Sequence, residues 1–195
     1  MVTVQQPDIQ TEETQAVSAS NCSDIEASHS VLSSCRDTQS SVLVSEVWDA
    51  LAEVPDPEIP MISVVDLGII RMVERDDAHV RVEVMPTFVA CPALDIIRDT
   101  IRARLAGFAP TVEVVTTFVE PWTTERITPE GRRKLRASGF APPIPGEELI
   151  LPVAAQCPYC GSHHTALETP FGPTLCRAIY YCHDCHQPFE QFKAV

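Results

Sequence analysis

Residues 79–105 read HVRVEVMPTFVACPALDIIRDTIRARL, and this stretch decides the fold of the larger part of the chain. Its first residues place valine at every second position, which predicts a strand over 79–85 with one buried face. Leucine and isoleucine then recur at helical spacing, which predicts a helix over 93–106, with Pro92 in its first turn and Gly107 at its end. A strand that leads into a helix is typical of a domain of mixed α and β structure.

A helix and a further strand are expected before this stretch. The helix is predicted to begin at Ser41 or Ser45 and to run through Val54, where a proline-rich loop ends it. The segment 69–74 suits a strand, and the polar residues after it suit a turn. We therefore expect a β-hairpin formed with 79–85.

A third strand and a polar helix are expected after the stretch. β-Branched residues predict the strand over 112–119, and the helix is predicted over 124–138, with Gly139 as its stop. The element order is then α-β-β-α-β-α. Residues 41–140 are therefore predicted to form a small α+β domain.

The first 40 residues are predicted to be an acidic tail. Residues 1–40 carry six acidic residues against one arginine and have no sustained apolar period, so we expect them to be disordered. Cys22 and Cys35 lie in this tail without the close spacing of a metal knuckle. They are either a metal or redox pair or, as we expect, two incidental thiols.

The composition changes after the proline-rich stretch that begins at Ala141. We expect a linker over 141–151 and a second domain over 152–195. This second domain holds five of the eight cysteines and four of the six histidines. Short β-strands are expected in it within 165–181 and over 189–192.

Two Cys-x-x-Cys pairs lie in the second domain, Cys157 with Cys160 and Cys182 with Cys185. Two intervening residues let both sulfurs of a pair turn toward one ion, and Gly161 permits the tight turn after the first pair. Four thiolates complete a tetrahedral zinc site, which would stabilise a domain too small to form its own core. The domain is therefore predicted to be a zinc ribbon; a rubredoxin-like iron site is the alternative.

The remaining polar residues of this domain have less specific predictions. The histidines are expected to be solvated or to support the cysteine ligands, because four cysteines already complete the site. Cys176 is either a packed thiol on a strand or a second labile thiol near Cys91.

Cys91 lies where a loop leads into the predicted central helix. Unpaired backbone N–H groups and the positive end of the helix dipole point toward this position and favour a thiolate there. A thiolate can ligate metal or attack an electrophile. The alternative is a small buried thiol of the core.

The overall composition excludes several classes of protein. The net charge is −13, with 27 acidic and 14 basic residues, which argues against a nonspecific nucleic-acid binder. No segment approaches the ~20 apolar residues of a membrane span, and no signal peptide is recognised, so we expect a cytoplasmic protein with no membrane partner. Cytosolic thiols are kept reduced, so eight cysteines indicate metal chemistry. No GxGxxG pattern points to a nucleotide-dependent enzyme.

Three short motifs in order resemble the iron–sulfur cluster assembly domain family, which includes the SufT-like proteins. They are Asp56-Pro57-Glu58, Asp66-Leu67-Gly68 and Thr87-x-x-x-Cys91-Pro92. The resemblance implies a role in iron–sulfur maturation, with Cys91 as the cluster or metal contact and Asp56 and Thr87 as further polar site residues. Asp56 could instead form an Asx-turn, and Thr87 a hydrogen bond where the helix begins. One cysteine cannot close a cluster site, so a homodimer that presents two copies of Cys91 is one hypothesis.

A second set of motifs resembles the D subunits of phenylacetyl-CoA 1,2-epoxidase systems. It comprises Pro121-Trp122-Thr123-Thr124, Phe171-Gly172-Pro173-Thr174-Leu175-Cys176-Arg177-Ala178 and the last cysteine pair. The resemblance implies an accessory, non-catalytic protein that assists cluster insertion into the epoxidase's reductase subunit, with that subunit and iron–sulfur donor proteins as partners. The implied cofactors are a structural zinc ion and a transient iron–sulfur cluster. The alternative is an electron-transfer or docking subunit of a multicomponent oxygenase.

Overall fold

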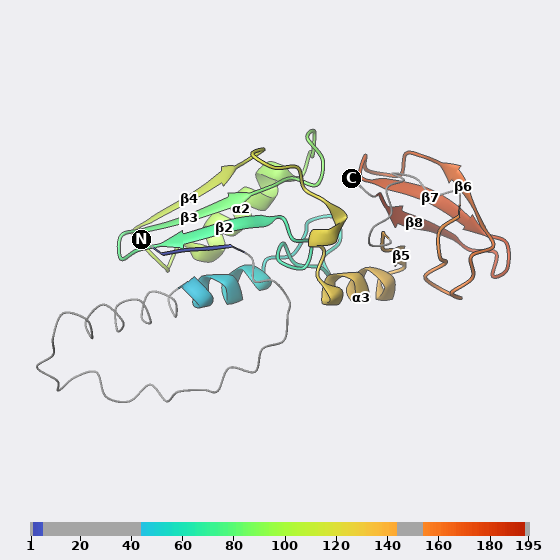
Figure 1. The fold of residues 1–195 in the computed structure, drawn as a ribbon, viewed down its shortest axis with the longest axis horizontal. Helices are drawn as coiled ribbons and strands as arrows, with labels where there is room; N and C mark the ends of the chain where they lie inside the picture. Colours follow the sequence, from blue (N-terminus) through green and yellow to red (C-terminus); the bar gives the residue numbers. More distant parts are fainter. Residues whose placement is uncertain (1, 6–43, 144–153, 194–195) are drawn as a thin grey trace, which may run out of the picture.

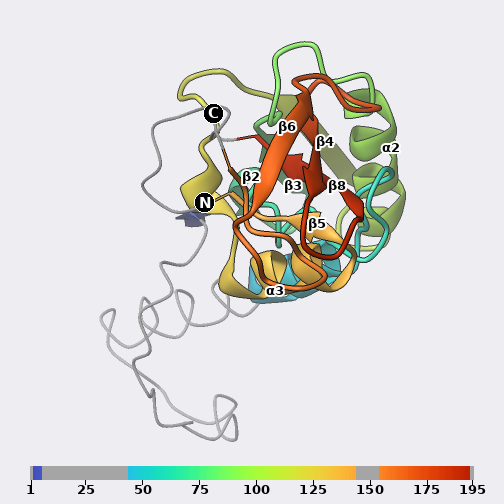
Figure 2. The same cartoon turned by 90° about the vertical axis from the view of Figure 1, so that its right-hand side faces the viewer.

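The computed structural model describes residues 2–5, 44–143 and 154–193, which form two four-stranded sheets and the helices that accompany the first of them. Figure 1 shows the two sheets side by side along the long axis of the molecule, with helix α3 beneath the place where they meet. Figure 2 looks along that axis with the second sheet in front. The α+β prediction is confirmed.

The first sheet is built around the predicted hairpin. Strands β2 (Ile70–Arg75) and β3 (His79–Val84) pair antiparallel, as expected. Helix α2 (Leu94–Leu105) then returns the chain to β4 (Thr111–Thr116), which pairs parallel with β3. The predicted strand–helix–strand stretch is confirmed, and it places Cys91 in the loop between β3 and α2.

Strand β1 (Val2–Gln5) was not predicted. It pairs antiparallel with β2, so the expectation of a disordered tail was wrong for these residues. Valine and threonine favour extended backbone, and the edge of β2 offers backbone groups that complete a ladder. The rest of the predicted tail, with Cys22 and Cys35, lies outside the described residues.

The first sheet and its helices (residues 2–5 and 44–139) form the first unit, and the apolar core of this unit lies on one face of the sheet. Val73, Val82 and Val114 are partners across β2, β3 and β4, and all three are buried. Leu51 of the first helix and Ile101 of α2 belong to the same apolar core. The next set of cross-strand partners is charged and is joined by ion pairs; it consists of Glu74, Arg81 and Glu113.

The first helix includes residues 44–52 and ends close to where the prolines were expected to end it. Ser45 lies inside the helix, so its prediction as the capping residue was wrong. Ser41 lies outside the described residues.

The polar helix predicted over 124–138 is two helices. A 3₁₀ turn, η1 (Thr124–Arg126), precedes α3 (Pro129–Ala137), and Thr128 between them has extended backbone. A residue before proline is driven out of the helical region, and Pro129 then suits the first turn of a new helix. The Thr128 side chain accepts a hydrogen bond from the Gly131 amide at 2.9 Å. Gly139, with a φ of 85°, ends α3 as predicted.

The second sheet contains the predicted ribbon and one strand from outside it. Strands β6 (Thr165–Thr169), β7 (Arg177–Cys182) and β8 (Pro188–Phe192) pair antiparallel. Strand β5 (Phe140–Ala141) pairs parallel with β8. The linker predicted over 141–151 therefore begins too early, because Ala141 already belongs to this sheet. Residues 144–151 of that linker lie outside the described residues.

The second sheet and its loops (residues 140–143 and 154–193) form the second unit, which makes apolar contacts with the first unit. Phe192 at the end of β8 is buried and belongs to the core of the first unit. Its ring centroid lies 6.0 Å from that of Trp122. The Trp122 indole in turn donates a hydrogen bond to the carbonyl oxygen of Leu67, at 2.9 Å. None of the helices in the described residues has the length and apolar content that a bilayer crossing requires.

Candidate functional site

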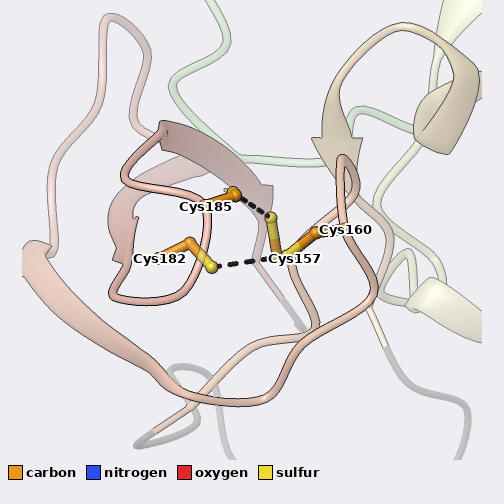
Figure 3. A group of neighbouring side chains, drawn as sticks. All are labelled: Cys157, Cys160, Cys182 and Cys185. Atoms are coloured by element: carbon orange, nitrogen blue, oxygen red, sulfur yellow. Dashed lines mark hydrogen bonds between the residues drawn. The ribbon is translucent and has the colours of Figure 1, made fainter.

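The four cysteines of the two Cys-x-x-Cys pairs converge at one end of the second sheet. Their sulfur atoms all lie within 4.8 Å of one another. Sulfurs of opposite pairs are 3.6 Å apart, Cys157 from Cys185 and Cys160 from Cys182 (Figure 3). Within the described part of the chain, these cysteines are the only group found that could hold a metal ion.

Each pair lies on a tight turn closed by a residue in the left-handed region. Gly161 has a φ of 77°, and its amide donates to the Cys157 carbonyl oxygen at 2.9 Å. His186 has a φ of 60° and donates in the same way to Cys182. The role of Gly161 was predicted, whereas that of His186 was not, because a histidine seldom adopts this conformation.

The cysteine cluster fits a tetrahedral metal ion. Two sulfurs bound at about 2.3 Å to one zinc ion lie about 3.8 Å apart, close to the observed spacing. Backbone hydrogen bonds from Cys185 and Asp184 hold the pKa of the Cys182 thiol at about 7. Burial and the neighbouring sulfurs raise the pKa of Cys185 to about 12. Ionisation of all four thiols at this spacing requires a cation to balance their charge.

None of the four histidines in the described part of the second unit belongs to the group of cysteines that could hold a metal ion. His164 Nδ1 lies 2.9 Å from Asp184 Oδ1, and the Ser162 hydroxyl donates to Oδ2 at 2.6 Å. Asp184 lies between the two cysteines of the second pair, so these contacts hold the turn that carries them.

A second candidate site lies at Cys91, where the two units meet. Cys91 lines a cavity of about 30 Å³ together with Asp56, Thr87 and Cys176. The cavity thus gathers all the site residues suggested by the assembly-domain resemblance. It also includes Cys176, which comes from the second unit.

The ionisation of Cys91 differs from the sequence prediction. Burial raises the pKa of its thiol, and the hydrogen bond from the Ala93 amide where α2 begins only partly offsets this. The negative charges of Cys176, Glu58 and Asp56 raise the pKa further. The half-buried position among acidic groups therefore opposes the thiolate that the sequence favours at Cys91.

Asp56 and Thr87 have different surroundings. Asp56 Oδ1 accepts hydrogen bonds from the amides of Glu58 and Ile59, at 2.9 and 2.8 Å, so the Asx-turn is present. Burial raises the pKa of Asp56 despite these bonds. Thr87 lines the cavity beside Cys91.

Two residues at this junction were missed by the sequence prediction. The carboxylate of Glu58, in the Asp-Pro-Glu motif of the loop, pairs with the guanidinium of Arg177 at 3.1 Å. Arg177 is buried and also pairs with Glu190, at 2.9 Å. Glu58 and Arg177 are 119 positions apart, and no local pattern signals their contact.

The chain matches two family descriptions, one in each unit. Residues 45–116 match the family described as "Iron-sulfur cluster assembly protein". Residues 147–193 match the "PaaD zinc beta ribbon domain". A protein of Escherichia coli (strain K12), named as the D component of 1,2-phenylacetyl-CoA epoxidase, is 39% identical over 155 residues, which are 78% of this chain and 93% of the relative.

Solved structures match about half of the chain. A domain of unknown function (DUF59) from Bacillus anthracis is 21% identical, with a TM-score of 0.48, and covers 51% of this chain and 96% of its own. A conserved hypothetical protein from Thermotoga maritima is 34% identical, with a TM-score of 0.41, and covers 47% of this chain and 91% of its own. The Escherichia coli match extends across both units, and the two matched domains lie in the same order as the two units. The chain therefore belongs to the PaaD family, the D subunits of phenylacetyl-CoA epoxidase systems, in which an iron–sulfur cluster assembly domain is joined to a zinc ribbon.

Proposed function

We propose that this protein is an accessory maturation factor of a phenylacetyl-CoA epoxidase system, and that it assists insertion of an iron–sulfur cluster into the reductase subunit. The observation that carries this proposal is the position of Cys91. Within the unit that matches the iron–sulfur assembly family, Cys91 lines a cavity beside Asp56 and Thr87. The cluster is the cargo of this protein, and no catalytic role is proposed.

The surroundings of Cys91 suit temporary binding of iron. The thiol is half-buried, and its raised pKa keeps it protonated until a cation replaces the proton. Clusters usually need four thiolates or their equivalents, so a site with fewer leaves positions for an acceptor protein. Incomplete coordination by this chain therefore favours release of the cargo. Partner thiols, including those of a second copy of this chain, would complete the coordination.

The ribbon cysteines have a separate role in this proposal. Cys157, Cys160, Cys182 and Cys185 would hold a structural zinc ion, which supplies a cross-link between the two turns of a small domain. The apolar cluster of the second sheet contains only a few buried residues, so the metal contributes much of its folding free energy. Zinc undergoes no redox change, which separates this site from the cargo.

Transfer of a cluster to the purified apo-reductase tests the function. The donor is a scaffold protein loaded with a [2Fe–2S] cluster under anaerobic conditions, and the readouts are visible absorbance and electron-transfer activity of the reductase. We expect the full-length protein to accelerate maturation and Cys91→Ala to lower the rate about tenfold or more, as loss of a ligand does. Cys22→Ala is the matched thiol control.

Each outcome of this test has a defined meaning. Unchanged acceleration by Cys91→Ala, with zinc content intact, would contradict the proposal and favour a docking subunit. A red, iron-loaded ribbon in the isolated protein would favour electron transfer, whereas one zinc ion per chain supports a structural ribbon.

A further inference from the structure

Arg177 joins the zinc ribbon to the loop that borders the Cys91 cavity. It is the first residue of β7, and its side chain is only 8% exposed. Each guanidinium nitrogen has its own partner: Nε donates to the Thr174 hydroxyl at 2.8 Å, Nη2 donates to the Glu58 carboxylate at 3.1 Å, and Nη1 lies 2.9 Å from the Glu190 carboxylate. These partners hold the planar guanidinium in one orientation. Of the three contacts, only the one with Glu58 crosses between the units.

Glu58 belongs to a loop that lines the cavity. Its amide donates to Asp56 Oδ1 at 2.9 Å, so its backbone is part of the Asx-turn. Both residues line the cavity together with Cys91. An anchor on the Glu58 carboxylate therefore fixes the position of this turn, and with it one wall of the space around the Cys91 thiol.

The ribbon also reaches the cavity with an apolar side chain. Phe192 of β8 is the cross-strand partner of Arg177, and partners in an antiparallel pair present their side chains on the same face of the sheet. Phe192 is buried in the core of the first unit and lines the cavity. One face of the ribbon thus docks on the first unit through an aromatic ring and an ion pair.

The ion pair is sensitive to the loss of either partner. A buried charge that loses its partner has to be rehydrated or has to move toward water, and Arg177 is buried. Glu58 and Arg177 are 119 positions apart, so the pair exists only while the ribbon is docked. The shape of the cavity therefore depends on a contact that the assembly unit cannot make by itself.

We propose that Arg177 is a positioning residue for the Cys91 site: its ion pair with Glu58 holds the Asp56 turn at the cavity and limits access to the Cys91 thiol. This inference rests on the proposed function, in which Cys91 contacts the cargo. It gives the ribbon a share in that site, besides the binding of its own metal ion. Loss of the ion pair frees the turn and opens the cavity.

Alkylation of Cys91 by N-ethylmaleimide tests this role in the full-length, zinc-loaded protein. The rate is measured for the peptide that contains Cys91, by mass spectrometry after timed quenching. We expect Arg177→Gln and Glu58→Gln each to raise the rate about threefold or more, as loss of a coupled contact does. The double variant should be no faster than the faster single variant, because both substitutions remove the same contact.

Two comparisons separate positioning from the effects of charge and of folding. The substitutions at Arg177 and Glu58 change the local charge in opposite directions, so a purely electrostatic effect on the thiol would change the two rates in opposite directions. Glu190→Gln is the matched control, because it removes the carboxylate that pairs with Arg177 inside the ribbon, and we expect it to change the rate less than about twofold. Metal analysis of each variant shows whether the ribbon is folded. Glu58 lies outside the ribbon, so Glu58→Gln decides the test if Arg177→Gln loses its zinc.

The outcomes separate this inference from the proposed function. An unchanged rate in Glu58→Gln, opposite changes in the two single variants, or an equal rise in Glu190→Gln would overturn the positioning role. In each of these cases, Cys91-dependent maturation of the reductase would leave the proposed function standing. Faster alkylation in both variants, combined with maturation that does not depend on Cys91, supports the positioning role and contradicts the proposed function. Faster alkylation combined with slower maturation in both variants supports both proposals.

Discussion

Gly68 occupies a position that no residue with a side chain fits. Its φ of 65° lies in the left-handed region, and an added Cβ would lie 2.1 Å from the carbonyl oxygen of Arg126. That contact is with backbone, so it cannot be relieved by a side-chain rotation. The Arg126 guanidinium also donates to the Gly68 carbonyl oxygen at 3.0 Å, which holds the two segments together. The family motif at Asp66-Leu67-Gly68 is therefore structural at its glycine.

Gly68→Ala should lower the free energy of unfolding by about 2–4 kcal/mol, since it combines left-handed strain with a backbone clash. Urea unfolding followed by circular dichroism measures the change. Gly107→Ala is the matched control, because an added Cβ there meets nothing within 4 Å. Equal stability of the two variants would show that the turn at Gly68 can move.

Asp66 makes stability depend on pH at acidic values. Burial raises the pKa of this carboxyl, but hydrogen bonds from Lys134, at 2.6 Å, and from Ser63 outweigh it and lower the pKa below 3.8. A carboxyl with a lowered pKa stabilises the fold above its unfolded pKa, and this contribution is lost as the pH falls through the folded pKa.

Asp66→Asn should therefore lower the free energy of unfolding by about 1–3 kcal/mol at pH 7. The difference from the wild-type protein should shrink as the pH falls below about 3.8. Urea midpoints measured between pH 7 and pH 3 check this. A difference independent of pH would mean that the charge of Asp66 contributes nothing.

At the scale of single elements, α3 depends on its cap. The Thr128 hydroxyl oxygen accepts from the Gly131 amide, and Pro129 contributes no amide hydrogen to the first turn. Thr128→Ala should lower the free energy of unfolding by about 1 kcal/mol, as measured in urea. Thr100→Ala is the control, because the Thr100 hydroxyl donates within α2, to Ile96, on an exposed face. A change at Thr128 no larger than that at Thr100 would contradict a capping role.

The elements that sequence predicts are those set by local periodicity. The hairpin of β2 and β3 and helix α2 follow from valine alternation and from a helical apolar stripe. The break between η1 and α3 was missed, although Pro129 is its local signal. Strand β1 could not be found, because its pairing with β2 joins segments about 70 positions apart. Long-range pairing is decided by the available edge of a sheet, which one segment does not reveal.

At the scale of the whole molecule, removal of the ribbon metal should destabilise the second unit more than the first. Removal of the ribbon metal with a chelator should abolish amide protection in β6, β7 and β8, because the cysteine turns lose their cross-link. Strands β2 and β3 should keep their protection, since their core is formed by apolar contacts. Hydrogen exchange with mass spectrometry measures both, and added zinc should restore the loss. Equal loss in both sheets would show a single cooperative unit.

The two candidate sites were accessible to sequence analysis to different degrees. The four ribbon cysteines follow from spacing alone, because each pair is a local turn. Cys91 follows from its place before a helix and from the resemblance to the assembly family. That Cys176 lines the same cavity depends on how the second sheet docks, and the Glu58–Arg177 ion pair at that junction has no local signature. Sequence therefore predicts the metal centre better than the shared cavity.

Strand β5 bears on how this ribbon could be transplanted. Phe140 and Ala141 follow α3 directly, yet they pair with β8, and the ring of Phe140 lies 5.3 Å from the guanidinium carbon of Arg177. A ribbon segment that begins at residue 147, where the match to the zinc-ribbon family begins, would lack strand β5, the fourth strand of its sheet. A chimera that moves the ribbon to a new host should therefore carry residues 140–193, and one that keeps only the assembly domain should end at Gly139.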